Sequence, residues 1–284
     1  MQRTGPTVAR RSLARILRER RKALNVKRED VARHAGVTPP TINRIEAASV
    51  RAEVGTVALM LDLYDFSDEE RAELLDMARA AKKRGWWQRY SLKVPKWFSV
   101  YIGLEHEAAA VLCYQVEVVP GLVQTEDYVR ALLRGESHAI SEEEEDRCVT
   151  VRRTRQKRLF GDDPPKVWAV ISEAALYRQV GGREVLREQL EQLIRLARQD
   201  RVTVQVLPAA AGAHAAIETP FTLLTFADPQ DRDVVYVEYR LGAVYLEEPD
   251  ESETYNAVFE QLTRKALDQE GSIALIRTAI KALG

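Results

Sequence analysis

The sequence predicts a multi-domain protein in which an all-α helical bundle is followed by an α+β domain with a mainly antiparallel sheet. The chain has 284 residues, which is long for one small module and favours two domains. Residues 1–51 carry 13 Lys and Arg against four Asp and Glu, a net charge of +9, whereas the remainder carries −10. The apolar pattern also changes, from helical spacing near the N-terminus to a mixture of helices and alternating strands further on.

The segment from Arg28 to Glu46 has the spacing of two short helices joined by a tight turn. Ala32 is small enough to let a second helix pack closely against the first. Gly36, four residues later, can adopt the positive φ that the turn needs. Ile42 and Ile45 lie one turn apart, as the inward face of the second helix requires. This spacing predicts a helix-turn-helix.

The start of the second helix has its own signals. Val37 is an apolar residue that can pack against the helices directly after the turn, and Thr38 is a residue type that caps helices. Pro39 then occupies the first helical position, where a missing N–H group costs nothing.

This segment resembles the Xre, or lambda-repressor-like, helix-turn-helix family. The resemblance covers about residues 8–65, including the basic stretch around residues 13–21 and an apolar helix around residues 54–64. It implies a bundle of about five helices whose third helix lies in the major groove of double-stranded DNA.

The resemblance also implies which side chains face the DNA. Arg44 is the candidate for reading guanine, because a guanidinium matches guanine O6 and N7, and Asn43 suits adenine or a phosphate. Lys27 and Arg28 stand where the family has Ser or Thr and then Gln, and Arg28 is expected to hold a phosphate. The prolines cannot donate hydrogen bonds and at most touch thymine methyl groups. The predicted DNA-binding residues are Lys27, Arg28, Thr38, Pro39, Pro40, Thr41, Asn43 and Arg44.

Two alternatives stay open at this point. Arg44 instead forms an ion pair with a carboxylate of its own helix, or the whole motif is a copy that has lost DNA binding. The basic charge alone does not decide, because many basic stretches are merely solvated helix faces.

The first domain is expected to end near residue 85. Ser67 and Glu70 form a capping box, and Lys82-Lys83-Arg84-Gly85 places cations and a glycine at the C-terminus of that helix. We therefore predict a DNA-binding domain at 1–85 and a second domain at 86–284. An aromatic stretch opens the second domain; it is interpreted as core or interface, with a ligand pocket as the alternative. It comprises Trp86, Trp87, Tyr90, Trp97, Phe98 and Tyr101.

The rest of the second domain alternates between helical and strand patterns. Helices are predicted at about 100–113, 125–133, 141–160, 183–199, 255–267 and 273–283. Strands are predicted at 114–119, 167–171, 202–207, 221–226, 234–239 and 244–246.

This part also resembles a domain that follows Xre motifs in many actinobacterial regulators and is described as antitoxin-like. The strings that carry the resemblance include Trp86-Trp87, Tyr101-Ile-Gly-Leu-Glu-His-Glu-Ala, Val119-Pro-Gly-Leu-Val-Gln-Thr and Arg152-Arg-Thr-Arg-Gln. The resemblance covers about residues 86–282. It implies a small protein partner encoded nearby and supplies no site residues.

A sequence-specific transcription regulator is therefore the leading hypothesis. It is expected to bind a palindromic operator as a homodimer, with the second domain serving dimerisation and the binding of a small partner or effector. The alternative is an antitoxin-like adaptor that sequesters a small partner protein and regulates its own promoter.

An enzyme is not expected, because phosphate-binding loops, nucleophile elbows and paired Cys motifs are missing from the sequence. The four histidines, at positions 34, 106, 138 and 214, are scattered, so neither a metal nor a cofactor is predicted. Two cysteines, the lack of a long apolar run and the lack of a secretory signal favour a cytoplasmic protein without a membrane anchor.

Overall fold

The computed structural model describes residues 6–83, 85–90, 94–136 and 140–284, and only the backbone of Arg89 and Tyr90. Arg84, the side chain of Tyr90 and His138, all considered in the sequence predictions, lie outside the described residues. The chain divides into two compact units. The first comprises Met1–Glu107 with Ala227–Asp231, and the second comprises Ala108–Phe226 with Arg232–Gly284. The first compact unit extends past residue 85 to Glu107 and includes the aromatic stretch. The predicted domain boundary at residue 85 therefore stays a prediction about function.

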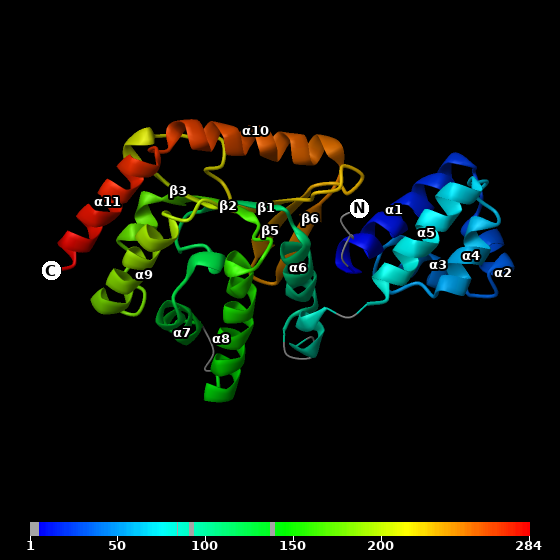
Figure 1. Cartoon of the computed structure of the whole chain (residues 1–284), viewed down its shortest axis with the longest axis horizontal. Coiled ribbons are helices and arrows are strands. Elements are labelled where there is room, and N and C mark those ends of the chain that lie inside the picture. The colour runs from blue at the N-terminus through cyan, green and yellow to red at the C-terminus, as the bar shows by residue number, and fades with distance from the viewer. Residues whose placement is uncertain (1–5, 84, 91–93, 137–139) are drawn as a thin grey trace. The chain divides into compact units, whose positions relative to one another are not determined.

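The first unit is all-α in its described residues, as predicted (Figure 1). Its helices are α1 (Pro6–Ala23), α2 (Arg28–His34), α3 (Pro39–Glu46), α4 (Val54–Leu61), α5 (Asp68–Ala81) and α6 (Lys96–Glu107), with a 3-10 segment at Trp86–Tyr90. The predicted capping box is confirmed: Ser67 and Glu70 bond each other's backbone N–H at the start of α5. That reciprocal pair fixes where α5 begins.

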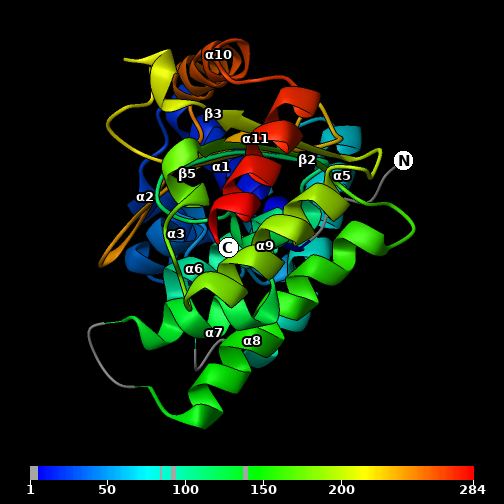
Figure 2. The same cartoon turned by 90° about the vertical axis from the view of Figure 1, so that its left-hand side faces the viewer.

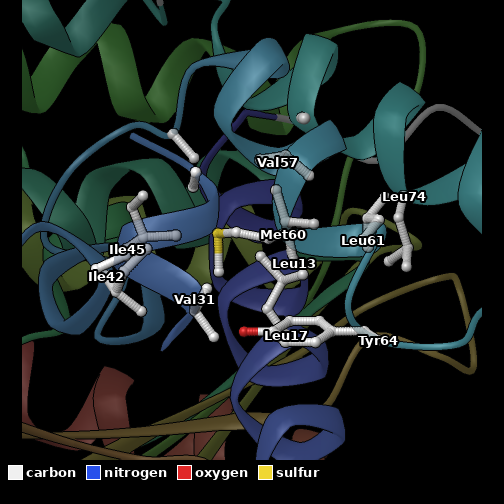
Figure 3. Packing of buried hydrophobic residues seen from close by; sticks show 14 residues of the cluster. Leu13, Leu17, Val31, Ile42, Ile45, Val57, Met60, Leu61, Tyr64 and Leu74 are labelled. Carbon is white, nitrogen blue, oxygen red and sulfur yellow. The ribbon is translucent and has the colours of Figure 1, made fainter. Parts of the chain in front are cut away.

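A shared hydrophobic core holds α1 to α5 together. Figure 3 shows Leu17 of α1, Val31 of α2, Ile42 of α3 and Met60 of α4 converging on one another. None of these four side chains exposes any surface to solvent. Because the core draws on every one of these helices, each short helix is stabilised by packing rather than by its own length.

The second unit contains a sheet of six strands in the order β3-β2-β1-β4-β5-β6 among the described residues. The strands are β1 (Ala110–Gln115), β2 (Lys166–Ser172), β3 (Val202–Leu207), β4 (Phe221–Thr225), β5 (Val234–Tyr239) and β6 (Gly242–Leu246). The pairs β1–β4, β4–β5 and β5–β6 are antiparallel, and β1–β2 and β2–β3 are parallel. The predicted α+β class is therefore confirmed, with a parallel part at one side of the sheet.

Helices cover both faces of this sheet. They are α7 (Glu126–Arg134), α8 (Glu142–Gln156), α9 (Arg183–Leu196), α10 (Pro249–Lys265) and α11 (Gln269–Ala282). Figure 1 shows α10 along one face and α7, α8 and α9 on the opposite side, and Figure 2 shows α11 beside α9. The chain from β1 to β2 passes through α7 and α8, and that from β2 to β3 through α9, as parallel pairing requires. Short 3-10 segments lie at Gly121–Val123, Lys157–Phe160, Glu173–Leu176 and Ala209–Ala211.

One stretch differs from the sequence prediction. The helix expected at about 100–113 is α6, which ends at Glu107, and the strand expected at 114–119 is β1, which already begins at Ala110. Apolar residues predominate from 100 to 119, so periodicity alone does not mark the change from helix to strand. The change is set by pairing: Cys113 lies opposite Ala169 of β2 and Thr222 of β4, both far along the chain.

Candidate nucleic-acid interface

The turn between α2 and α3 has the geometry that the sequence predicts. Gly36 has a φ of +65°, and the N–H of Val37 donates to the carbonyl of Ala32 at 2.9 Å. Ala32 is 1% exposed, so the two helices meet closely at this small residue. The predicted helix-turn-helix is therefore present, with a left-handed glycine at its corner.

The inner face of α3 anchors it to the unit. Ile42 is 0% and Ile45 is 4% exposed, and both belong to the core drawn in Figure 3. The opposite face is open: Thr38, Pro39, Pro40, Asn43 and Arg44 are exposed, and Thr41 is half-buried. The six residues predicted to project from this helix therefore lie on one side, away from the core.

The predicted role of Thr38 as a side-chain cap is wrong. Thr38 does occupy the capping position, but its hydroxyl accepts no hydrogen bond from a helix N–H. Pro39 and Pro40 fill the first two helical positions, so the N–H that a cap residue often binds is missing at Pro40. The Thr41 N–H donates instead to the carbonyl of Thr38 at 2.8 Å, and the two threonine hydroxyls lie 3.0 Å apart.

Arg44 and Asn43 keep most of their donors available. Arg44 Nη2 donates to the hydroxyl of Thr41 at 3.2 Å, and within the described residues Arg44 takes part in no ion pair. The alternative of a carboxylate pair inside α3 thus finds no partner there. In the same part of the chain, the Asn43 side chain makes no hydrogen bond. Both groups are free to meet a ligand from solvent.

Arg28 is held by a buried carboxylate. Its Nε donates to Glu46 Oε2 at 2.9 Å, and its side chain is 38% exposed. Lys27, beside it, is exposed. Part of the Arg28 guanidinium is therefore used to bind Glu46, and only the rest is available to a ligand. The exposed side chain of Lys27 is not held in this way.

The carboxylate that holds Arg28 also holds α1. Glu46 is 1% exposed at its side chain and accepts from Arg21 Nε at 2.5 Å and from Arg21 Nη2 at 3.0 Å. This hydrogen bonding raises the pKa of Arg21 above its usual value. Arg21 in turn donates to the carbonyl of Val26, just before α2. The network joins the end of α3 to α1 and to the start of α2, so it fixes the angle of the exposed helix.

Sequence reasoning missed the roles of Arg21 and Glu46. Arg21 lies within a run of basic residues, and Glu46 is one of few acids in the segment. Their separation of 25 residues matches no local pairing rule. A glutamate directly after the buried Ile45 is the one signal in the sequence that marks a carboxylate in need of a partner.

Comparison with known families agrees with this geometry. A helix-turn-helix domain model matches residues 12–74. The short helix pair, its glycine turn and the exposed face of α3 thus define a protein with a DNA-binding helix-turn-helix domain.

A second family model, described as a domain of unknown function, DUF5753, matches residues 98–278. This match spans more than half of the chain, and the chain belongs to the DUF5753 family. No curated protein and no solved structure matches the chain. Among the described residues, no helix has both the length and the apolar character needed to cross a bilayer.

Proposed function

We propose that the protein is a sequence-specific transcription regulator of the Xre type that binds double-stranded DNA. The observation that carries the proposal is the open face of α3, where Asn43 and Arg44 offer unoccupied donors above the buried Ile42 and Ile45. A helix of this kind reads base edges in the major groove. DNA binding would place the protein in the cytoplasm.

The proposed contacts divide into two kinds. Arg44 and Asn43 read bases, with Thr38 and Thr41 beside them, and Pro39 and Pro40 touch thymine methyl groups. Lys27 and the exposed part of Arg28 bind phosphates, which position the protein without reading sequence. Residues 1–85 form the proposed DNA-binding domain, and residues 86–284 form the domain for dimerisation and partner binding.

We further propose a homodimer on a palindromic operator, since a single helix pair contacts only one half-site. Light scattering of the purified chain, alone and with a selected operator, measures the stoichiometry. One chain per palindromic site would refute the dimer.

The test of DNA reading starts from sites selected out of a random DNA pool by the full chain. Arg44→Ala is expected to lose about 1–3 kcal/mol of binding free energy on the selected site and to relax its sequence preference. Lys27→Ala is expected to weaken all sequences alike and to reduce the salt dependence by about one counterion. Arg264→Ala is the matched control, because it removes the same charge from an exposed position of α10. Equal losses on selected and random DNA for both Arg44→Ala and Lys27→Ala would refute base reading by Arg44.

The alternative function is an antitoxin-like adaptor that sequesters a small protein and binds DNA only to regulate its own promoter. The resemblance of residues 86–282 to the domain described as antitoxin-like favours it. Purification from the native host, followed by sequencing of bound DNA and identification of bound protein, separates the two. Many enriched sites support the regulator, whereas one site together with a stoichiometric small partner from a neighbouring reading frame supports the adaptor. A lack of enriched DNA at physiological salt refutes both.

A further inference from the structure

The first unit contains a large cavity that the helix-turn-helix does not use. Its volume is about 1210 Å³, and all of its lining residues belong to that unit. Pockets for small organic molecules are commonly about 300–1000 Å³, so this one is large enough to hold such a molecule. The walls come from the N-terminal turns of α1, the loop after α3, the end of α5, the Trp86–Gln88 segment and the start of α6.

The charged side chains that line the cavity are positive. Arg10, Arg51 and Lys96 line it, and no Asp or Glu is among the described residues of its walls. Neither Arg51 nor Lys96 forms an ion pair with any described residue. Three positive charges in one concave site, none of them in an ion pair with a described residue, favour an anionic occupant.

Arg10 carries the clearest sign of a missing partner. Its Nε is buried and has no hydrogen-bond partner within the described part of the chain. Burial, and then repulsion by Arg51, lower the pKa of Arg10, while the nearby Glu107 acts in the opposite direction. Glu107 is already occupied, because it accepts hydrogen bonds from the N–H groups of Thr7 and Val8 at 2.9 and 2.7 Å. A buried donor of this kind is costly unless a ligand satisfies it.

The other walls are indole rings. Trp86, Trp87 and Trp97 line the cavity; Trp87 is 5% exposed, and the other two are half-buried. The rings of Trp86 and Trp87 meet edge to face with centroids 6.1 Å apart. A Cβ on Gly85 would lie 2.2 Å from the Trp87 ring, so a glycine is required for this ring to sit where it does. Indole faces offer flat apolar surface for a planar molecule.

We propose that this cavity binds a small aromatic acid, a planar ring bearing a carboxylate or phosphate group. The ring packs against Trp86 and Trp97, and the anionic group pairs with Arg10 and Arg51. Guanidinium groups suit both anions, because they donate two parallel hydrogen bonds to two oxygens.

The site lies next to the exposed helix of the helix-turn-helix. Ala48, Ser49 and Arg51 of its lining belong to the loop that directly follows α3. Ala48 has a φ of +53°, and Ser49 donates from both its N–H and its hydroxyl to the carbonyl of Arg44, at 3.0 Å each. A ligand that pairs with Arg51 therefore contacts the segment that ends α3. The aromatic acid thus acts as an effector of DNA affinity, and this second step rests on the proposed function.

Ligand binding is tested without DNA, by isothermal titration calorimetry of the full chain. The probes are salicylate, indole-3-acetate and flavin mononucleotide, each compared with its uncharged analogue: salicylamide, indole-3-acetamide and riboflavin. At least one acid is expected to bind in the micromolar to millimolar range, about tenfold or more tighter than its uncharged analogue. No binding by any of the three acids, or equal binding of acid and uncharged analogue, overturns the proposal.

Variants locate the site. Arg51→Gln, in a loop, and Arg10→Gln are each expected to weaken binding about tenfold, as is Trp97→Leu for the ring. Arg79→Gln on the exposed side of α5 is the matched control and is expected to leave binding unchanged. Circular dichroism checks that each variant folds, and Arg51→Gln decides the matter if Arg10→Gln does not fold. Binding that Arg51→Gln leaves intact overturns the assignment.

The effect on DNA is measured afterwards, with the selected operator and the acid that binds most tightly. A change in operator affinity that Arg51→Gln abolishes supports the effector role. An acid that binds with no change in operator affinity overturns that role and leaves the ligand site standing. If the unaltered chain binds the acid but binds no DNA under any condition, the proposed function alone is refuted.

Discussion

Loss of the Glu46 carboxylate should strongly destabilise the first unit. Its side chain is 1% exposed and accepts three hydrogen bonds, two from Arg21 and one from Arg28. Glu46→Gln removes the negative charge and leaves Arg21, 10% exposed at its side chain, without a counterion. Breaking a buried ion pair from one side costs about 3–5 kcal/mol. Glutamine keeps one acceptor oxygen, so we expect a loss near the lower end, about 3 kcal/mol.

Urea unfolding of the full chain measures this loss. Three of the four tryptophans, Trp86, Trp87 and Trp97, lie in the first unit, so fluorescence mainly reports on that unit. Glu53→Gln is the matched control. It removes a carboxylate that is 71% exposed and pairs with Lys82 at 2.5 Å, and it should cost less than about 1 kcal/mol. A loss for Glu46→Gln no larger than for this control would refute the reasoning.

Two further predictions concern the turn and the start of α1. Gly36→Ala should lower the free energy of unfolding by about 1 kcal/mol, because its φ of +65° disfavours a Cβ although the space around it is open. In urea unfolding Gly36→Asn should cost less, and an alanine variant as stable as the parent contradicts the turn geometry. Burial raises the pKa of Glu107 to about 7, so the native chain binds a proton that the unfolded chain releases near pH 4.5. Stability should therefore fall, by on the order of 1–3 kcal/mol, as pH rises from 4.5 to above 7. Glu107→Gln should remove this part of the pH dependence of the melting temperature. A melting temperature that varies with pH in the same way in the variant and the parent would contradict this role of Glu107.

The parts of the fold that sequence predicts well are those whose causes are local. The turn at Gly36 and the capping box at Ser67 each depend on residues a few positions apart, and the structure confirms both. The strand start predicted at residue 114 is wrong, because β1 begins at Ala110 and is set by partners in β2 and β4 that lie more than fifty residues away. Non-local pairing leaves no periodic trace in the strand itself.

The candidate sites divide in the same way. The exposed side of α3 follows from helical spacing around Ile42 and Ile45, so its residues can be read in advance. The ion pairs of Glu46 with Arg21 and Arg28, and the cavity, cannot be predicted in this way. Arg10, Arg51 and Trp97 come from three separate segments, and only the packing of α1, the loop after α3 and α6 brings them together.

The two prolines that open α3 have a consequence for the unfolded chain. Pro39 and Pro40 each lock φ near −65°, and Pro39 restricts Thr38 before it to extended backbone. Thr38 has this extended conformation in the folded protein, with φ −88° and ψ 151°. The unfolded chain therefore samples few conformations at the corner leading into α3, and folding loses correspondingly less entropy there. The corner that leads into α3, an eight-residue helix too short to persist alone, is thus restricted before the core forms around it.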